Sequence, residues 1–281
     1  MKPPVVGARA PSVLIMDGDR VALRVTDAAD VELAVAALST RILERRRLDE
    51  TLAGRLLEMA VQPIVHFPAS GGRHVGAFEA LLRPTHPEWD QPAPVLAAAE
   101  NLGRTGELGL IVAHLAARWL SRLDPCTQLF VNLHPHQLSD PSRVERELLP
   151  LLPHAKRIVL EITERSRLQD LGRWAETVQH LYGLGFSIAV DDLGSGWSSL
   201  DILAELQPQF IKIDMSLVRG IDSAPRKRQL VELIHHFADA TNAQVVAEGV
   251  ETAEEADTLR EVGVRWLQGY FFGRPELDFA G

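Results

Sequence analysis

From about residue 52 onward, short apolar runs alternate with longer amphipathic stretches. Eight of the apolar runs have the length and composition of buried strands, and they occupy residues 61–67, 75–82, 128–133, 157–163, 186–190, 209–213, 244–247 and 264–267. The later runs are separated by helix-length segments, such as 168–184 and 225–241. Strands rich in Val, Ile and Leu with helical crossovers predict a parallel sheet that is covered on both faces.

The first two runs differ from the others because only a short turn around Ser70, Gly71 and Gly72 separates them. Such a connection is too short for a helical crossover, so these two strands should pair antiparallel. Eight strands in about 220 residues favour an α/β fold, a (β/α)8 TIM-like barrel with an antiparallel first strand. A doubly wound open sheet is the alternative.

The N-terminal segment has a different pattern. Two apolar runs within residues 12–25 flank a turn at 17–19, which predicts a β-hairpin. Thr26 or Asp27 can cap a following helix, whose apolar stripe would comprise Val31, Val35, Leu38 and Ile42. We therefore expect an N-terminal extension at residues 1–51, a candidate regulatory or dimerisation element, and the barrel at residues 52–281.

Polar side chains occupy or follow the C-terminal half of seven predicted strands. They are Glu79, Asn132, Glu161, Asp191, Asp192, Lys212, Glu248 and Gln268. In a barrel the strand C-termini meet at one face, so these side chains should converge. Five carboxylates with a single lysine would repel each other by several kcal/mol for each close pair. The pattern therefore predicts divalent metal ions at this face.

The types of ligand atom limit which metal ions can bind. Asp, Glu and Asn offer only oxygen, which suits Mg²⁺, Mn²⁺ or Ca²⁺, and Cys126 is the only cysteine, so a thiolate cluster is excluded. Asp191 and Asp192 could supply a carboxylate that bridges two ions, an arrangement that assists displacement at a phosphodiester. Lys212 would hold the attacking water, stabilise phosphate charge, or form an ion pair within the cluster.

Composition limits the partners and the location. The formal net charge of −9 disfavours binding to long DNA. No apolar run is long enough to span a bilayer, and the start of the chain lacks the features of a secretory signal. Together with the single cysteine, these features predict a cytoplasmic protein.

Several motifs resemble those of the EAL domain, the cyclic di-GMP phosphodiesterase family. They are Gln62-Pro63-Ile64-Val65, Glu79-Ala80-Leu81-Leu82-Arg83, Val131-Asn132-Leu133, Glu161-Ile162-Thr163-Glu164, Asp191-Asp192-Leu193-Gly194, Lys212-Ile213-Asp214, Glu248-Gly249-Val250-Glu251 and Gln268-Gly269-Tyr270-Phe271. The resemblance covers roughly residues 52–276, in the family's order and spacing.

The resemblance implies hydrolysis of the bacterial second messenger cyclic di-GMP to linear pGpG with two Mg²⁺ or Mn²⁺ ions, Ca²⁺ being inhibitory. The implied metal ligands are Glu79, Asn132, Glu161, Asp191, Asp192 and Glu248. Lys212 would position the catalytic water, and Gln268 would support the water and metal network. Gln62 and Arg83 would contact the substrate, Phe271 would stack on guanine or belong to the core, and Glu251 would anchor the loop after Asp192.

Some residues depart from the family's usual pattern, mildly at Ser195 and Trp197, which keep a hydroxyl and an aromatic ring, and more strongly at two other positions. Pro84 replaces an aromatic residue after Arg83, and Leu193 replaces a Phe in the loop after Asp192. His134 and His136 resemble a metal pair, but we interpret them as loop residues near the barrel mouth. The alternatives are a catalytically silent cyclic di-GMP sensor that acts through a protein partner, and another metal-dependent barrel enzyme. The resemblance also implies a homodimer.

Overall fold

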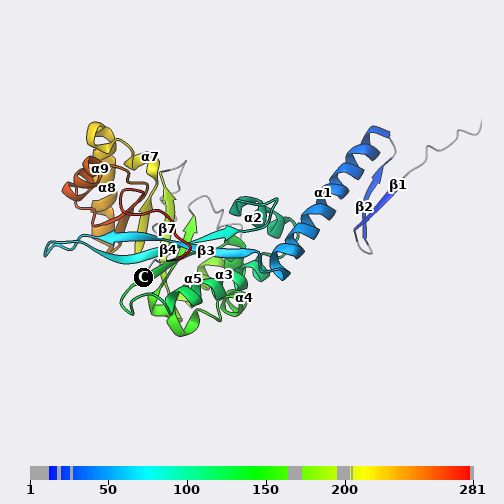
Figure 1. The fold of residues 1–281 in the computed structure, drawn as a ribbon, viewed down its shortest axis with the longest axis horizontal. Coiled ribbons are helices and arrows are strands. Elements are labelled where there is room, and N and C mark those ends of the chain that lie inside the picture. The colour runs from blue at the N-terminus through cyan, green and yellow to red at the C-terminus, as the bar shows by residue number, and fades with distance from the viewer. Residues whose placement is uncertain are drawn as a thin grey trace, which may run out of the picture.

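The computed structural model describes residues 13–17, 20–25, 28–163, 173–194, 203 and 205–278, with side-chain environments from residue 32 onward. Within these residues, eight strands form a closed barrel in the order β10-β3-β4-β5-β6-β7-β8-β9 (Figure 1). The strands are β3 (Leu57–His66), β4 (His74–Pro84), β5 (Gln128–Asn132), β6 (Ile158–Thr163), β7 (Ser187–Leu193), β8 (Phe210–Ile213), β9 (Gln244–Ala247) and β10 (Trp266–Gln268). The barrel prediction is confirmed, and the open-sheet alternative is wrong.

Strand β3 pairs antiparallel with both β4 and β10, while every other neighbouring pair in the barrel is parallel. The predicted antiparallel pairing of the first two strands is therefore present. The direction of β3 also has a consequence for the site. On β3, residues earlier in the sequence lie closer to the C-terminal rim of the barrel, whereas on the other strands later residues do.

Helices surround the barrel. They are α2 (Pro92–Asn101), α3 (Thr105–Leu120), α4 (Pro141–Glu147), α5 (Trp174–Gly183), α7 (Met215–Val218), α8 (Pro225–Thr241) and α9 (Ala253–Glu261), with the 3₁₀ helices η1 (Pro135–Ser139), η2 (Leu152–Arg157) and η4 (Ile221–Ser223). Helix α8 matches the predicted helical segment 225–241 because Pro225 occupies its first turn and Asn242 ends it in a left-handed conformation. Helix α5 occupies the second half of the predicted segment 168–184, and the first part of that segment lies outside the described residues.

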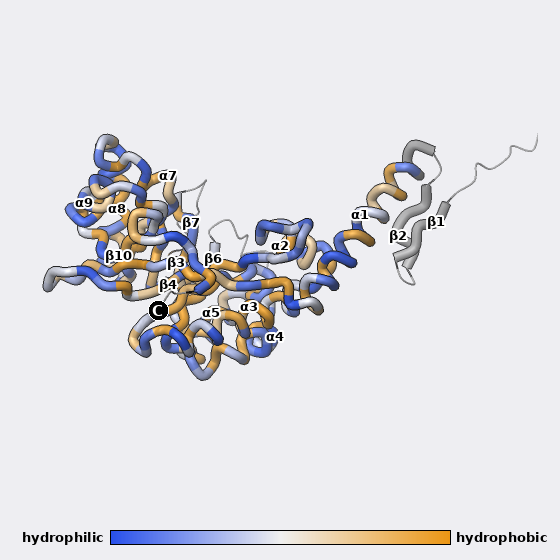
Figure 2. The backbone as a smooth tube through the Cα atoms, in the orientation of Figure 1, coloured by the Kyte–Doolittle hydropathy of each residue, from blue (hydrophilic) through white to orange (hydrophobic). Residues whose placement is uncertain are grey.

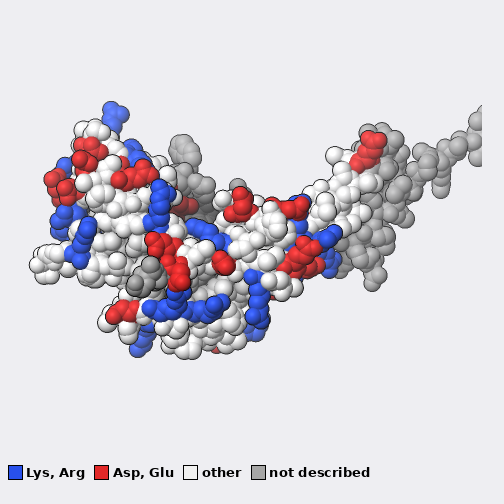
Figure 3. Space-filling view, in the orientation of Figure 1, with Lys and Arg blue, Asp and Glu red and all other residues white. Residues whose placement is uncertain are grey.

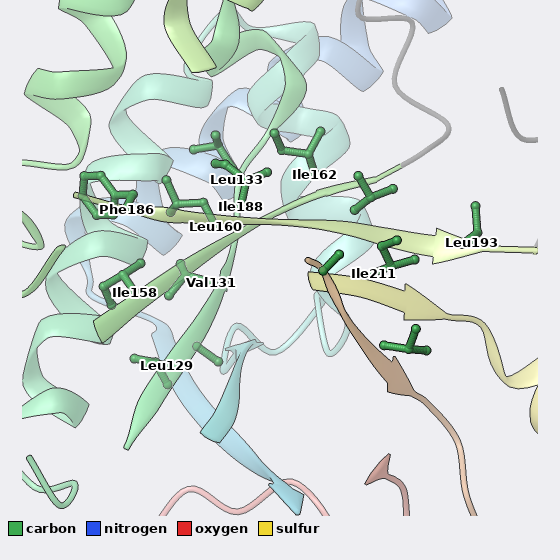
Figure 4. Close-up of a cluster of buried hydrophobic side chains, with 14 of the residues drawn as sticks. Leu129, Val131, Leu133, Ile158, Leu160, Ile162, Phe186, Ile188, Leu193 and Ile211 are labelled. Atoms are coloured by element: carbon green, nitrogen blue, oxygen red, sulfur yellow. The ribbon is translucent and has the colours of Figure 1, made fainter. Parts of the chain in front are cut away.

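The strands bury two separate apolar layers because alternate side chains point to opposite faces. One layer lies between the strands and the helices, and includes Leu129, Val131, Ile158, Leu160 and Ile188 (Figure 4). The other layer fills the barrel interior, with Ile64, Ala77, Phe130, Val159, Ala189, Phe210 and Val246 packed against Trp266. The hydropathy-coloured backbone in Figure 2 shows apolar segments in the barrel strands and a mixture of apolar and polar positions along the helices.

The N-terminal segment forms the predicted hairpin, β1 (Val13–Asp17) and β2 (Arg20–Val25), followed by helix α1 (Ala28–Ala53). Helix α1 projects from the barrel and carries the hairpin at its far end (Figure 1). It continues across the predicted boundary between residues 51 and 52. No helix within the described residues has both the length and the apolar character needed to cross a membrane.

Candidate active site

A polar layer lies on top of the apolar layer inside the barrel. Each of the eight strands supplies one interior apolar side chain, and a polar side chain on the same face lies two residues closer to the rim. These polar residues are Glu79, Asn132, Glu161, Asp191, Lys212, Glu248 and Gln268 after the apolar residue, and Gln62 before Ile64 on the antiparallel strand β3. Because the strands close into a barrel, the side chains that the sequence predicted to converge are carried to one place.

Lys212 occupies the centre of this layer and is fully buried. Its Nζ lies 2.5 Å from Glu161 Oε1, 2.7 Å from Glu248 Oε1, 3.2 Å from Asp191 Oδ1 and 3.6 Å from Glu79 Oε2. These four carboxylates come from four different strands or the residues that follow them. The ion-pair alternative for Lys212 is therefore present in the structure, and this lysine is the only cation that the described residues place among the acids.

Two glutamines extend the network toward β3. Gln268 Nε2 donates to Glu79 Oε2 at 2.6 Å and lies 3.2 Å from Gln62 Oε1, which accepts a second hydrogen bond. Gln62 Nε2 in turn donates to the carbonyl oxygen of Gly273 at 3.1 Å. The amide pair thus fixes the orientation of the Glu79 carboxylate and joins it to the segment after β10.

Asp191 and Asp192 both reach the cluster because β7 contains a bulge. Val190 pairs with Ile211 and Leu193 pairs with Ile213, so two residues of β7 lie opposite the single residue Lys212 of β8. Asp192 has φ 64°, a left-handed conformation that Asp tolerates better than most residues. Consecutive residues of a regular strand point to opposite faces, and the bulge removes this restriction. Ligand atoms of Asp191, Asp192 and Glu248 consequently all lie within 4.8 Å of one another.

Burial dominates the electrostatics of the layer. It raises the pKa of Glu161 well above its usual value, although Lys212 opposes the shift, and it raises the pKa of Glu248 to about 8. Burial alone would lower the pKa of Lys212, but Asp191, Glu161, Glu248 and Glu79 outweigh it and raise this pKa well above its usual value. Lys212 is thus held in its charged form, but its single charge does not offset the burial of Glu161 and Glu248.

The donor set fits divalent cations. Glu161 Oε1 contacts Lys212, but Glu161 Oε2 and Gln268 Oε1 accept no hydrogen bond from the described residues, although both atoms are buried. A buried carboxylate without hydrogen bonds is costly unless a cation accompanies it. Oxygen ligands from several strands suit Mg²⁺, Mn²⁺ or Ca²⁺. Residues Glu79, Asn132, Glu161, Asp191, Asp192 and Glu248 could hold such ions.

The other predicted site residues lie around this layer. Asn132 is exposed and lies opposite Glu161 in the pairing of β5 with β6. Arg83 is half-buried beyond Glu79 on β4, and its Nη1 donates to the Leu82 carbonyl oxygen at 3.0 Å. Phe271 is 42% exposed and lies edge-on to Phe272, so its interpretation as a core residue is wrong, and its stacking on guanine stays a prediction.

Glu251 forms an ion pair with Arg219, which directly follows α7. Its predicted role was to anchor the loop after Asp192, but residues 195–202 of that loop lie outside the described residues, so the role stays a prediction. His134 and His136 stack on each other at the start of η1, and their Nε2 atoms lie 3.1 and 3.8 Å from Glu100 Oε1.

Glu255 was not among the predicted site residues. Its buried carboxylate accepts hydrogen bonds from the backbone nitrogens of Gly220, Glu251 and Thr252 at 2.8, 2.9 and 3.3 Å. It therefore ties the segment after β8 to the segment after β9, which carries Glu248. The spacing of Thr252 and Glu255 is that of a helix capping box, a signal that the sequence does contain.

Comparison with known proteins places this arrangement in a family. The EAL domain model matches residues 45–275. The cyclic di-GMP phosphodiesterase PdeB of Shewanella oneidensis is 31% identical over 239 residues, which cover 82% of this chain and 28% of PdeB. The probable cyclic di-GMP phosphodiesterase PdeN of Escherichia coli is 30% identical over 247 residues, which cover 85% of this chain and 47% of PdeN. The chain thus spans less than half the length of either relative.

Solved structures agree with the sequence comparison. The PaMucR phosphodiesterase in a c-di-GMP complex matches with a TM-score of 0.72 at 30% identity, covering 83% of this chain and 97% of that chain. Klebsiella pneumoniae BlrP1 in a manganese and c-di-GMP complex matches with a TM-score of 0.69 at 32% identity, covering 79% of this chain and 56% of that chain. From its sequence, its barrel and the family model, the chain belongs to the EAL domain family.

Proposed function

We propose that the protein is a cyclic di-GMP phosphodiesterase that hydrolyses cyclic di-GMP to linear pGpG with two Mg²⁺ or Mn²⁺ ions. The observation that carries this proposal is the set of four carboxylates that surround Lys212 at the rim of an EAL barrel. Support comes from the relatives PdeB and PdeN, which are named as phosphodiesterases, and from BlrP1, which binds manganese and c-di-GMP together.

The ions would be held by Glu79, Asn132, Glu161, Asp191, Asp192 and Glu248. When bound, they would polarise the phosphodiester. They would also lower the pKa of water, which makes the water a stronger nucleophile toward phosphorus. The Asp191–Asp192 bulge is the feature that offers two adjacent carboxylates from one strand, as a paired site requires. In BlrP1 a complex with calcium is also known, which fits the proposal that Ca²⁺ permits binding and inhibits turnover.

The reaction adds one water to one of the two bridging phosphates. A new P–O bond forms, the P–O3′ ester bond breaks, and the departing 3′-oxygen takes up a proton. The product is linear, with a 5′-phosphate and a free 3′-hydroxyl. Lys212 would donate hydrogen bonds to the attacking water or to the phosphate, because it is held in its charged form and cannot serve as a base.

The remaining residues would position the substrate. Gln268 and Gln62 hold the Glu79 carboxylate in place through their shared hydrogen bonds. Arg83 would contact a phosphate, because its guanidinium carries no ion pair within the described residues and lies just beyond the ligand Glu79. Phe271, which is exposed on the segment after β10, would stack on a guanine.

Turnover is tested by incubating the purified chain with cyclic di-GMP and Mg²⁺, Mn²⁺ or Ca²⁺ and separating the products by chromatography. We expect pGpG with Mg²⁺ or Mn²⁺, none with Ca²⁺, and none with the Glu79→Ala variant. Absence of pGpG with both activating metals would refute the proposal. Calorimetry in Ca²⁺ then separates a silent sensor, which binds without hydrolysis, from a protein that does not bind cyclic di-GMP.

We also propose that the protein is a homodimer. Its oligomeric state is tested by light scattering.

A further inference from the structure

The last two turns of helix α1 are joined to the segment that follows Arg83. Arg47 forms an ion pair with Glu88, and Glu50 Oε2 lies 3.4 Å from His86 Nε2. His86 is buried, and its Nδ1 accepts a hydrogen bond from the Glu88 backbone nitrogen at 3.2 Å. We call residues 84–91 the rim segment, because they lead from the end of β4 to the start of α2. Two polar contacts thus join the rim segment to α1.

A second set of contacts joins α1 to the helices behind the rim segment. Asp49 pairs with Arg104, which precedes α3. Leu48 and Leu52 are buried in a cluster separate from the main core, together with Trp89 of the rim segment and residues of α2 and α3. Figure 3 shows acidic and basic side chains side by side where α1 meets the barrel. The end of α1 therefore contacts the rim segment, residues of α2 and α3, and the residue that precedes α3.

The position of the rim segment and α2 matters to the site. A cavity of about 320 Å³ lies between strands β4 and β5 and helices α2 and α3, and most of its lining is apolar. Arg83, Asn132 and Thr163 from three strands and Pro92 and Leu96 from α2 also line it. Helix α2 thus shares this cavity with Asn132, a proposed metal ligand, and Arg83, a proposed phosphate contact. A small displacement of α2 would therefore change the space beside Arg83 and Asn132.

The outer half of α1 projects beyond the contacts at its base. The helix has 26 residues, which gives a length of roughly 39 Å. Its apolar residues Leu33, Val35 and Ile42 are 74%, 53% and 59% exposed, so this half contributes little to its own docking. At its base, the buried Leu48 and Leu52 dock the helix, and exposed or half-exposed ion pairs, which are individually weak, add to this docking. The ion pairs are therefore the part of the docking that a single substitution can alter without opening the apolar cluster.

We propose that the last two turns of α1 position the rim segment and α2, and so set the affinity of the site for cyclic di-GMP. This inference rests on the proposed function and adds a regulatory role for the N-terminal extension. Arg47 and Asp49 act as positioning residues, because they contact the rim segment and the residue before α3, and neither belongs to the polar layer that would hold the metals. Weakening their contacts should therefore change substrate affinity more than the rate of the chemical step.

The test compares three variants by steady-state kinetics with cyclic di-GMP. Arg47→Glu replaces the ion pair with Glu88 by a repulsion and should raise KM about threefold while kcat stays within error, since an exposed pair contributes only modestly. Arg45→Glu makes the same charge change two residues earlier, at an exposed position with no ion pair among the described residues, and should leave KM unchanged. The charge swap Arg47→Glu with Glu88→Arg should restore the wild-type KM.

Two results would overturn the inference. One is an equal KM for Arg47→Glu and Arg45→Glu, and the other is a charge swap that fails to restore KM although its melting temperature matches that of the wild type. If the wild-type protein gives no turnover with Mg²⁺ or Mn²⁺, the proposed function fails separately. The same three variants are then compared by the dissociation constant for cyclic di-GMP in Ca²⁺, with the same pattern expected.

Discussion

Replacing Lys212 by Met should destabilise the metal-free protein strongly, because it removes the cation at the centre of the polar layer. Four carboxylates lie within 3.6 Å of its Nζ, and both Lys212 and Glu161 are fully buried. Methionine fills similar space, so the substitution removes charge with little loss of packing. The acids that remain would repel each other without a counter-charge.

The magnitude follows from the cost of breaking a buried ion pair. Removing one partner costs about 3–5 kcal/mol, because the other charge is left buried and unpaired. For a chain of this size each kcal/mol lowers the melting temperature by about 2–4 °C, so a decrease of about 10 °C is expected. Proton uptake by the acids limits the loss, since burial already raises the pKa of Glu161, and that of Glu248 to about 8.

The pH dependence has a definite sign. A carboxyl group whose folded-state pKa is raised stabilises the protein below its unfolded pKa and loses this contribution as pH rises through the folded value. In the Lys212→Met variant the deficit in stability should therefore be small near pH 6 and largest near about pH 9. The assay is thermal unfolding with EDTA at both pH values. Lys156→Met, the same substitution at an exposed lysine, serves as the control and should melt like the wild type.

The second part of this test measures how much Ca²⁺ stabilises the variant and the wild type. A Ca²⁺ concentration a hundred times the dissociation constant of the wild type should stabilise the wild type by about 2.7 kcal/mol, and both proteins are compared at this one concentration. The stabilisation should be greater in Lys212→Met than in the wild type, because the variant no longer presents a positive charge beside the ion. The reasoning is refuted if Lys212→Met melts like Lys156→Met in EDTA near about pH 9, or if Ca²⁺ stabilises it no more than the wild type.

Three further predictions concern single residues. Glu79→Gln should fold normally but lower kcat at least about a thousandfold in a cyclic di-GMP assay, because a neutral amide is a poor ligand for a divalent ion. Asp192→Ala should lose about 1–2 kcal/mol of stability in urea because of its left-handed φ, whereas Asp192→Gly should not, and calorimetry should show weaker metal binding in both. Burial raises the pKa of Tyr182, whose hydroxyl donates to the Leu206 carbonyl oxygen, to about 12. Its contribution to stability should therefore be present below about pH 10 and lost as pH rises toward 12, and Tyr182→Phe should flatten this decline in melting temperature.

Much of the fold could be predicted from the sequence because the strands of a covered parallel sheet are short apolar runs. The eight runs correspond to β3–β10, with small shifts at their ends. The polar residues at the strand ends could also be predicted to converge, because the C-terminal ends of the parallel strands in a closed barrel lie at one face. Glu79, Glu161, Asp191 and Glu248 indeed surround Lys212 in the structure.

Other features depend on geometry that the pattern of residues does not reveal. Gln62 lies at the start of its apolar run and not at its end, because β3 is antiparallel, so a search for polar residues after each run misses it, and only the family resemblance indicated it. The β7 bulge depends on the left-handed conformation of Asp192, a residue type that also adopts ordinary strand geometry. The docking of α1 depends on long-range ion pairs, such as that between Arg47 and Glu88, which helical periodicity cannot predict.

The most direct test of the proposed chemistry is hydrolysis of cyclic di-GMP in ¹⁸O-labelled water with Mn²⁺, followed by mass spectrometry of the product. The polar layer around Lys212 should deliver water to phosphorus, so we predict pGpG with one ¹⁸O atom on its 5′-phosphate and none on its 3′-hydroxyl. Unchanged cyclic di-GMP, or label on the 3′-hydroxyl, would contradict the assignment of this layer as a phosphodiesterase active site.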